Sequence, residues 1–339
     1  MDRRRRCRAG RTRFSGNRPI ARGHGFFGDA VKLAAFDIGT NTVLMLAVEL
    51  LPEGSVRPIL DLARITRIGR GVDRSGELDP EAVRRTIDAI ADFAAAARKA
   101  GVEKFVGVAT SALRDARNGE SFIAEVKRRT GLALEVISGR TEAELSHLAV
   151  QRGLPIDPAA RLLIVDIGGG STELIRCERG RELALASLQI GSVRLTERIV
   201  HGDPPSPADA QRLREEIDRV LNTTGWEFAP DILVAVAGTA TTVCAVALGL
   251  ETYDPARVHG HVLSREEVSR TLARFGELPL AERRRLKGLE EGRADVIFAG
   301  TMILDRVMEH FKVPSVVVSD QGVRWGLVWR EVERLGVGA

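Results

Sequence analysis

The chain has 339 residues, of which 44% are hydrophobic and 28% are charged, an ordinary composition for a globular protein that buries its own core. Its formal net charge is +4, but residues 1–30 hold nine arginines, and the remaining body has 41 basic and 44 acidic residues. The mildly acidic body argues against a specific nucleic-acid-binding face as its main function.

Residues 1–30 are rich in arginine and poor in apolar residues, which predicts a disordered tail. The tail could contact a polyanion, have no function, or be an artefact of a start codon assigned too early. It lacks the apolar segment of a secretory signal, and no stretch of the chain approaches the ~18 consecutive apolar residues of a membrane helix. The few, scattered cysteines argue against disulfides and zinc. We therefore expect a cytoplasmic protein without membrane contact.

The first half of the body begins with two strands around a tight turn. Apolar, β-favouring residues in 33–50 flank the turn formers Gly39, Thr40 and Asn41. A helix is predicted over 79–101, because Asp79 can cap it and apolar residues recur every three or four positions. The other expected elements are an extended segment over 55–69, a buried strand that leads into a polar turn with Arg114, a helix over 118–130, a short strand, and a helix over 140–152.

The second half repeats this order. Residues 161–178 again contain a strand, a tight glycine turn and a second strand. The later elements are expected to be a strand over 181–190, a helix over 206–222, a buried strand that runs through Gly238 and Thr239 into a helix over 231–248, helices over 264–275 and 292–311, and a strand, turn and helix over 313–335. Alternating strands and helices predict α/β layering. We place a domain boundary near residues 153–158, where glycine, proline and aspartate cluster.

Several buried strands end in glycine with serine or threonine beside it. Glycine lets the backbone approach an anion, consecutive amides can point at phosphate oxygens, and a following helix N-terminus adds positive potential. One such turn is weak evidence, since hairpins also use glycine, but three in corresponding places favour phosphate binding. The candidate phosphate-binding residues are Gly39, Thr40, Asn41, Gly168, Gly169, Gly170, Ser171, Gly238 and Thr239.

Acidic residues lie directly before two of these turns. Asp37 and Asp166 end their strands, and Glu173 follows Asp166 across the turn. Phosphate chemistry commonly uses Mg²⁺, which is held by one or two carboxylates and by substrate oxygens. A strand-end aspartate can also simply cap the turn. That alternative competes well for Asp37, whereas a metal is favoured for Asp166 with Glu173.

Seven stretches of the chain resemble the exopolyphosphatase and guanosine pentaphosphate phosphatase family, in the order found there. They are VKLAAFDIGTNT, VATSALRDA, EVISGRTEAEL, LLIVDIGGGSTEL, VAVAGTATTV, EGRADVIFAGTMIL and VSDQGVRWGLV, and they cover residues 31 to about 330. The resemblance implies two ribonuclease-H-like (actin-like) α/β domains that face each other across a cleft, at 31–153 and 154–321. The final helix, 322–335, is then expected to pack on the first domain.

The resemblance also implies residue roles. Glu142 falls on the proposed catalytic base, Arg114 on a phosphate-gripping arginine, and Asp166 with Glu173 on an acidic pair linked to Mg²⁺ and catalysis. From the residues alone, Glu142 could merely favour the start of a helix, and Arg114 could form a surface ion pair with Asp115. The family's Arg293 and Asp295 are also present, but they could instead pair with each other. Glu144, near Glu142, is expected on the surface.

The resulting hypothesis is an Mg²⁺-dependent phosphatase that removes terminal phosphates from inorganic polyphosphate. The alternative substrate is guanosine pentaphosphate (pppGpp), because both reactions cleave a phosphoanhydride at a chain end. Two other classes stay open: a non-catalytic sensor of phosphate or nucleotide, and a kinase-like phosphotransferase. Relatives often form homodimers, but nothing in the sequence establishes one here.

Overall fold

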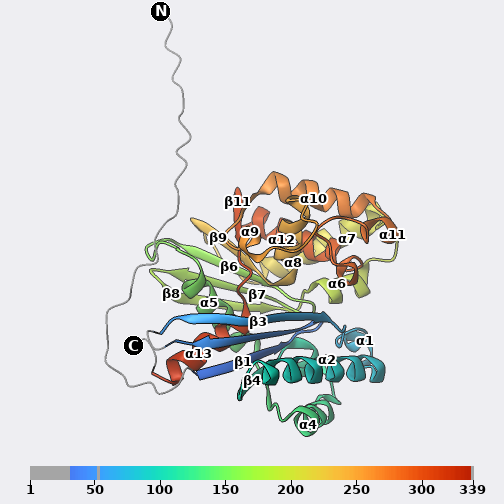
Figure 1. Ribbon diagram of the computed structural model, residues 1–339. Coiled ribbons are helices and arrows are strands. Elements are labelled where there is room, and N and C mark those ends of the chain that lie inside the picture. The colour runs from blue at the N-terminus through green and yellow to red at the C-terminus, as the bar shows by residue number, and fades with distance from the viewer. Residues whose placement is uncertain (1–30, 52–53, 337–339) are drawn as a thin grey trace, which may run out of the picture.

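The computed structural model describes residues 31–51 and 54–336, so the predicted tail at 1–30 lies outside the described residues. Two α/β domains, each built on its own sheet, face each other across a cavity (Figure 1). This arrangement confirms the predicted fold class. None of the helices in the described ranges combines the length and apolar composition that a membrane span requires.

The first sheet has the strand order β3-β2-β1-β4-β5. Its first three strands form an antiparallel meander, and β4 and β5 then continue parallel to β1. This order is the ribonuclease-H-like arrangement that the resemblance implies. The strands are β1 (Val31–Ile38), β2 (Thr42–Leu50), β3 (Val56–Ile65), β4 (Lys104–Ala109) and β5 (Leu134–Val136).

The second sheet repeats this topology. Its order is β10-β11-β9-β6-β7-β8, in which β6, β7 and β8 form the antiparallel meander and β9 and β11 run parallel to β6. Only the short antiparallel strand β10 has no counterpart in the first sheet. The strands are β6 (Leu162–Ile167), β7 (Thr172–Glu178), β8 (Arg181–Leu188), β9 (Ile232–Val236), β10 (Val262–Ser264) and β11 (Ser315–Val318).

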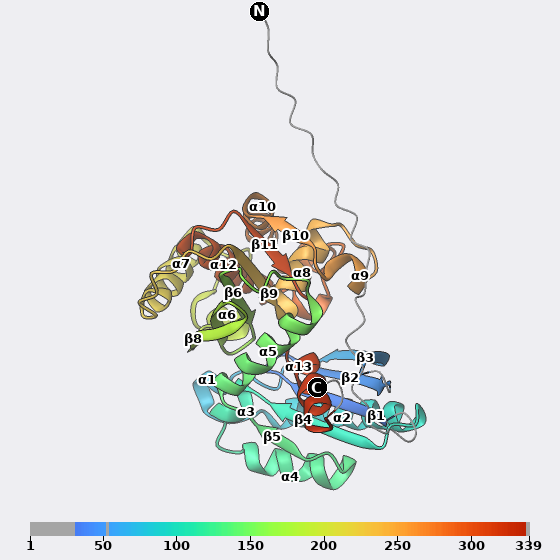
Figure 2. The same cartoon turned by 90° about the vertical axis from the view of Figure 1, so that its left-hand side faces the viewer.

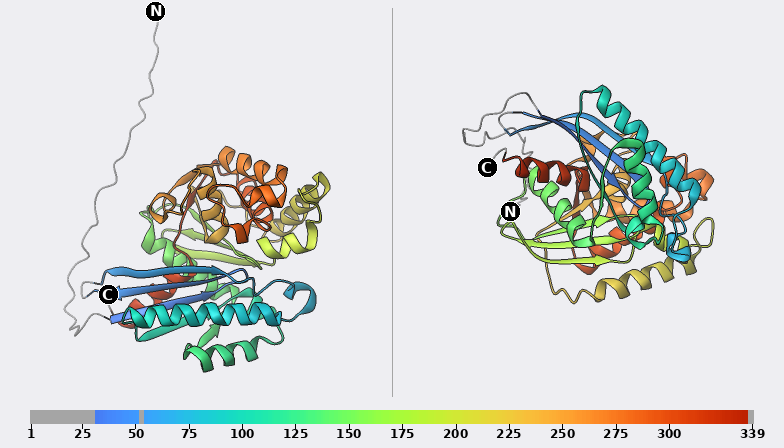
Figure 3. Two further views of the ribbon diagram at one scale, coloured as in Figure 1. Left: turned by 45° about the vertical axis from the view of Figure 1, so that its right-hand side comes forward. Right: turned by 90° about the horizontal axis from the view of Figure 1, so that it is seen from below.

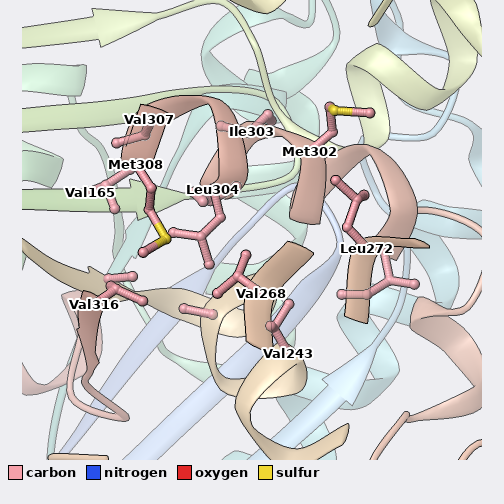
Figure 4. Close-up of a cluster of buried hydrophobic side chains, with 14 of the residues drawn as sticks. Val165, Val243, Val268, Leu272, Met302, Ile303, Leu304, Val307, Met308 and Val316 are labelled. Atoms are coloured by element: carbon pink, nitrogen blue, oxygen red, sulfur yellow. The ribbon is translucent and has the colours of Figure 1, made fainter. Parts of the chain in front are cut away.

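Helices cover the outer face of each sheet. In the first domain these are α2 (Pro80–Lys99) and α4 (Gly119–Thr130), and Asp79 caps α2 as expected by accepting a hydrogen bond from the Ala82 amide. In the second domain α7 (Pro207–Asn222), α8 (Ala237–Ala247), α10 (Arg265–Glu277) and α12 (Ile297–His310) enclose the larger core, part of which Figure 4 shows. The shorter helices are α1 (Val72–Ser75), α3 (Ser111–Asp115), α6 (Ser192–Ile199), α9 (Pro255–Val258) and α11 (Leu280–Arg283), with a 3₁₀ turn at Glu291–Arg293.

Two helices, α5 (Gly139–Gly153) and α13 (Val323–Arg334), lie between the sheets (Figures 2 and 3). Leu327 of α13 packs in a buried cluster with β1 and β2 of the first domain, and Leu145 of α5 joins this cluster. Val150, on the same helix α5, packs on the second sheet. Gly326 permits the close approach of the two helices, since a Cβ there would be 2.1 Å from the Leu145 carbonyl oxygen. The last helix therefore contributes to the core of the first domain.

Several short or shifted elements differ from the expectations, among them the unpredicted α1, α9, β10 and α11. Residues 111–115 form helix α3 instead of a polar turn, and α6 was not predicted at all. The helix expected over 292–311 begins only at Ile297, after a separate 3₁₀ turn. Helices of one or two turns show too few repeats of the apolar period to be recognised in a sequence.

Candidate active site

The cavity between the domains has a volume of about 630 Å³ and is lined by both hairpin turns. Most of the predicted site residues line it, whereas Arg114 and Glu173 do not. The predicted residues that line the cavity are Asp37, Gly39, Thr40, Asn41, Glu142, Asp166, Gly168, Gly169, Gly170, Ser171, Gly238 and Thr239.

In the second domain, the glycine loop between β6 and β7 presents three consecutive amides to the cavity. The carbonyl oxygens of Gly168 and Gly169 accept hydrogen bonds from the backbone amides of α6, and the carbonyl of Gly170 accepts one from Arg194 Nε at 2.7 Å. Since a trans peptide points its N–H away from the preceding carbonyl, the amides of Gly169, Gly170 and Ser171 face away from α6. No acceptor for these three amides lies in the described part of the chain. Such a row of free amides is an anion-binding nest.

The turn of the first domain lies directly opposite and is built in a similar way. The carbonyl of Asn41 accepts hydrogen bonds from the amides of Thr66 and Arg67, at 3.0 and 2.9 Å. The side-chain Nδ2 of Asn41 is buried and has no hydrogen-bond partner in the described structure. The turns approach so closely that a Cβ at Gly169 would lie 2.9 Å from the Cβ of Thr40. Glycine is therefore required where the turns of the two domains approach each other.

A third set of donors comes from the N-terminus of α8. Its N-cap, Val236, forms no side-chain capping bond, and Gly238 and Thr239 of the first turn line the cavity. The first amides of a helix lack internal acceptors and carry its positive dipole end, so they attract anions. Three donor groups thus converge on one volume large enough for several phosphoryl groups.

Facing these donors is a cluster of four carboxylates, of which Glu142, Asp166 and Glu173 are buried and Asp37 is partly exposed. The β6–β7 register places Asp166 directly opposite Glu173, and the charges of both raise the pKa of Glu142 on α5. Asp37 of the first domain lines the same cavity as Asp166, whose charge helps to raise the pKa of Asp37. Ser146 Oγ donates to Asp166 Oδ2 at 2.5 Å and Ser187 Oγ donates to Glu173 Oε1 at 2.8 Å, which fixes both side chains.

Burial is the largest cause of the raised pKa values in this cluster, and mutual repulsion adds to it. Burial and the charge of Asp166 raise the pKa of Asp37 to about 7 and that of Glu173 to about 8. Burial raises the pKa of Asp166 to about 6, and the pKa of Glu142 is raised well above its usual range by burial and by the other three carboxylates. A positive charge bound among these groups would therefore favour their ionised forms.

A divalent cation fits this cluster by the chemistry of its donors. The ligands are hard carboxylate oxygens, and Glu142 Oε2 and Glu173 Oε2 are buried with no hydrogen-bond partner in the described structure. No group of three or more His, Cys, Asp or Glu side chains within the described ranges is arranged to hold a metal by itself. One or two carboxylates with substrate and water oxygens remain sufficient for Mg²⁺, which rarely occupies an all-protein cage.

Arg114 contacts Glu142 and not Asp115. Its Nη1 lies 3.5 Å from Glu142 Oε2 and donates to the Ile137 carbonyl at 2.8 Å, while Asp115 pairs with Arg194. The ion pair with Asp115 that the sequence left open is therefore absent. In this arrangement Arg114 contacts the candidate base directly and is placed to orient its carboxylate.

Arg293 is a lining residue whose position the sequence did not reveal. Its Nη2 donates to Thr42 Oγ1 at 3.2 Å, and a Cβ at Gly238 would lie 2.2 Å from its Nη1, so the guanidinium lies on the α8 turn. It pairs with Glu290, whereas Asp295 pairs with Arg67, so the alternative of an Arg293–Asp295 pair is wrong. The family motif marked Arg293, but only the tertiary structure brings it to the cavity.

The raised carboxylate pKa values predict how the Glu173→Gln variant changes stability with pH. A carboxyl group whose pKa rises from 4.5 unfolded to about 8 folded destabilises the protein increasingly as pH passes through that interval. The variant lacks this penalty, so its Tm relative to the unmodified protein should increase from pH 5 to pH 8, by several degrees. Thermal unfolding in EDTA measures this. A Tm difference that stays constant across the interval would show that Glu173 is not destabilised by its charge.

The chain is similar in sequence and in fold to known phosphatases. The sequence profile of the Ppx/GppA phosphatase family matches residues 48–335. Exopolyphosphatase 2 of Mycobacterium tuberculosis H37Rv is 34% identical over 312 residues, which are 87% of this chain and 97% of that protein. The crystal structure of the Aquifex aeolicus Ppx/GppA family member has 33% identity and a TM-score of 0.77 and covers 91% of this chain and 99% of that one. An exopolyphosphatase from Cytophaga hutchinsonii has 25% identity and a TM-score of 0.83, with 91% and 100% covered.

Proposed function

This chain belongs to the Ppx/GppA phosphatase family, and from that premise we propose that it is an exopolyphosphatase that hydrolyses the terminal phosphate of inorganic polyphosphate in the cytoplasm, with Mg²⁺ as cofactor. As a family member it is a hydrolase, and several relatives carry the name exopolyphosphatase. One observation carries the proposal: the free amides of the glycine loop, the unpartnered side-chain amide of Asn41 on the opposite turn and one helix N-terminus face a carboxylate cluster across a single cavity.

The proposed reaction uses the two sides of the cavity for different tasks. The loop amides and the α8 N-terminus bind the oxygens of the terminal phosphoryl group and stabilise the charge that builds on them. Glu142 accepts a proton from the attacking water, and a carboxylate with a raised pKa is a stronger base than an exposed one. Bound at Asp166 and its neighbours, Mg²⁺ would neutralise the negative charge shared by the carboxylates and the phosphate.

The outer part of the cavity favours pppGpp as a second candidate substrate. Tyr253, Pro255 and Leu286 line it, and they offer apolar surface that a polyphosphate chain would not use. The lining cations of the described cavity, Lys287, Arg293 and Arg324, each have an acidic partner. A nucleoside attached to the terminal phosphates could occupy this part, whereas a long polyanion gains little there.

Phosphate release by the full-length chain with Mg²⁺ tests the proposal on three substrates: short-chain polyphosphate, long-chain polyphosphate and pppGpp. We expect polyphosphate turnover to exceed that of the nucleotide, with short chains favoured over long ones because acidic residues outnumber basic ones along the cavity. Faster turnover of pppGpp would select the second candidate. Tight binding without phosphate release from any of them would instead support a non-catalytic sensor, and transfer to an acceptor other than water would support a phosphotransferase.

A further inference from the structure

One buried arginine on α6 connects segments of both domains behind the cavity. The guanidinium of Arg194 donates from Nε to the Gly170 carbonyl at 2.7 Å and from Nη2 to Asp115 Oδ2 at 2.6 Å, and its Nη1 pairs with Asp73. Its side chain is only 10% exposed. All three nitrogens of the guanidinium therefore have a partner. One partner belongs to the second domain and two belong to the first.

On the side of the second domain, Arg194 completes the anchoring of the glycine loop. Backbone amides of α6 hold the carbonyls of Gly168 and Gly169, but the described chain gives the Gly170 carbonyl no hydrogen-bond donor besides Arg194 Nε. The peptide that begins at Gly170 carries the N–H of Ser171, one of the three free amides. The direction of that amide therefore depends on a side chain, while the other two depend on the backbone of α6.

On the side of the first domain, the two acceptors belong to separate short helices. Asp73 lies in α1, and Asp115 ends α3 directly after Arg114, the residue that contacts Glu142. Neither carboxylate can reach Arg194 unless the domains are close together. Opening of the cavity would remove two of the three acceptors from a buried guanidinium, whose charge is costly to leave unpaired.

We propose that Arg194 is a positioning residue that couples closure of the two domains to the orientation of the phosphate-binding loop. In the closed arrangement, Asp73 and Asp115 hold the guanidinium where Nε reaches the Gly170 carbonyl, and the Ser171 amide then faces the cavity. When the domains separate, this support is lost and the loop loses its third ordered donor. The proposed role in turnover rests on the proposed phosphatase function, but the predicted effect on domain closure does not.

Arg198 provides a matched control on the same helix. It also pairs with Asp73 across the domains, but its side chain is 45% exposed and its hydrogen bonds go to Asp73 and not to the glycine loop. Removing Arg198 therefore weakens an ion pair between the domains without touching the loop. A comparison of the two arginines separates loop positioning from simple interdomain attraction.

The kinetic test compares Arg194→Ala, Arg194→Lys and Arg198→Ala on short-chain polyphosphate with saturating Mg²⁺. Misplacement of a binding group by about 1 Å commonly costs on the order of 100-fold in rate. We expect Arg194→Ala to lower kcat by about that factor. Lysine should not restore it, since a single ammonium cannot reach three acceptors in different directions. Arg198→Ala should stay within about threefold of the unmodified protein, as expected for an exposed ion pair.

A structural readout that needs no activity measures closure directly. Spin labels on exposed Glu120 of α4 and Glu266 of α10 report the distance between the domains by pulsed electron resonance. We expect Arg194→Ala to broaden this distance distribution toward longer values and Arg198→Ala to leave it nearly unchanged. The double variant Asp73→Asn/Asp115→Asn keeps Arg194 but removes both acceptors of the first domain, and it should resemble Arg194→Ala.

Three results would overturn the proposal: unmodified kcat and distances in Arg194→Ala, an equal loss in Arg198→Ala, or normal behaviour of the Asp73→Asn/Asp115→Asn variant. The double variant decides the matter if Arg194→Ala does not fold. Failure of the proposed function would be distinct, because the unmodified protein would then release no phosphate from polyphosphate. The distance measurements would still test the coupling in that case.

Discussion

Replacing Glu142 with glutamine is expected to lower kcat for phosphate release by roughly 10²- to 10⁴-fold, the usual contribution of a general base. Glutamine keeps the shape of the side chain but cannot accept a proton from water. Glu142 is buried, lines the cavity, and its Oε2 has no hydrogen-bond partner in the described structure apart from the 3.5 Å ion-pair contact of Arg114. Steady-state kinetics together with equilibrium binding of short-chain polyphosphate give the measurement, and binding should persist.

Glu144 supplies the matched control for this experiment. It lies two residues further along α5, is about half exposed, and pairs with Arg140 on the surface. Glu144→Gln should keep kcat within about twofold, since changes to exposed ion pairs have small effects. If Glu142→Gln turns over at the same rate as Glu144→Gln, Glu142 is not the base.

Replacing Asp166 with asparagine is the second change with a large expected effect. It should lower the affinity for Mg²⁺ by about 100-fold, because a cation held by one or two carboxylates depends strongly on each of them. The same change removes one of four mutually repelling carboxylates, so the metal-free protein should become more stable. Asparagine can still accept the hydrogen bond from Ser146. The signature is thus a higher Tm in EDTA combined with loss of the Tm increase that Mg²⁺ produces.

This signature separates metal binding from a purely structural role. If Asp166 only stabilised the turn, its replacement would lower the Tm in EDTA, and Mg²⁺ would have the same effect on both proteins. Glu251→Gln is a suitable control, because Glu251 lines the same cavity but is exposed and pairs with Lys287. Its Mg²⁺ response should match that of the unmodified protein.

The sequence predicted the parts of the site that depend on local structure. Each hairpin was visible because an apolar run, an aspartate and a glycine turn follow one another, and the strand register then places Asp166 beside Glu173. The α/β class followed from the alternation of apolar runs. Such features involve neighbours in the chain, where spacing determines which side chains share a face.

Features that combine distant segments could not be predicted in this way. Helix α6 has only eight residues, and Arg194 on it is buried although arginine is usually exposed, so no pattern marked either. The carboxylate partner of Arg114 comes from another helix, α5, and Arg293 reaches Thr42 of the first domain, so only the packing of distant elements decides these contacts. The meeting of Asp37 with Asp166 likewise depends on how the two domains are docked.

The position of α13 has a consequence for how the chain folds as it is made. The cluster that closes one face of the first sheet joins Leu33, near the beginning of the described chain, to Val332, near its end. A ribosome must therefore release nearly the whole polypeptide before this face is covered, whereas the second domain is continuous from β6 to β11. The domain that is synthesised first is thus completed last. Its uncovered apolar face makes the nascent chain a natural client for chaperones during that interval.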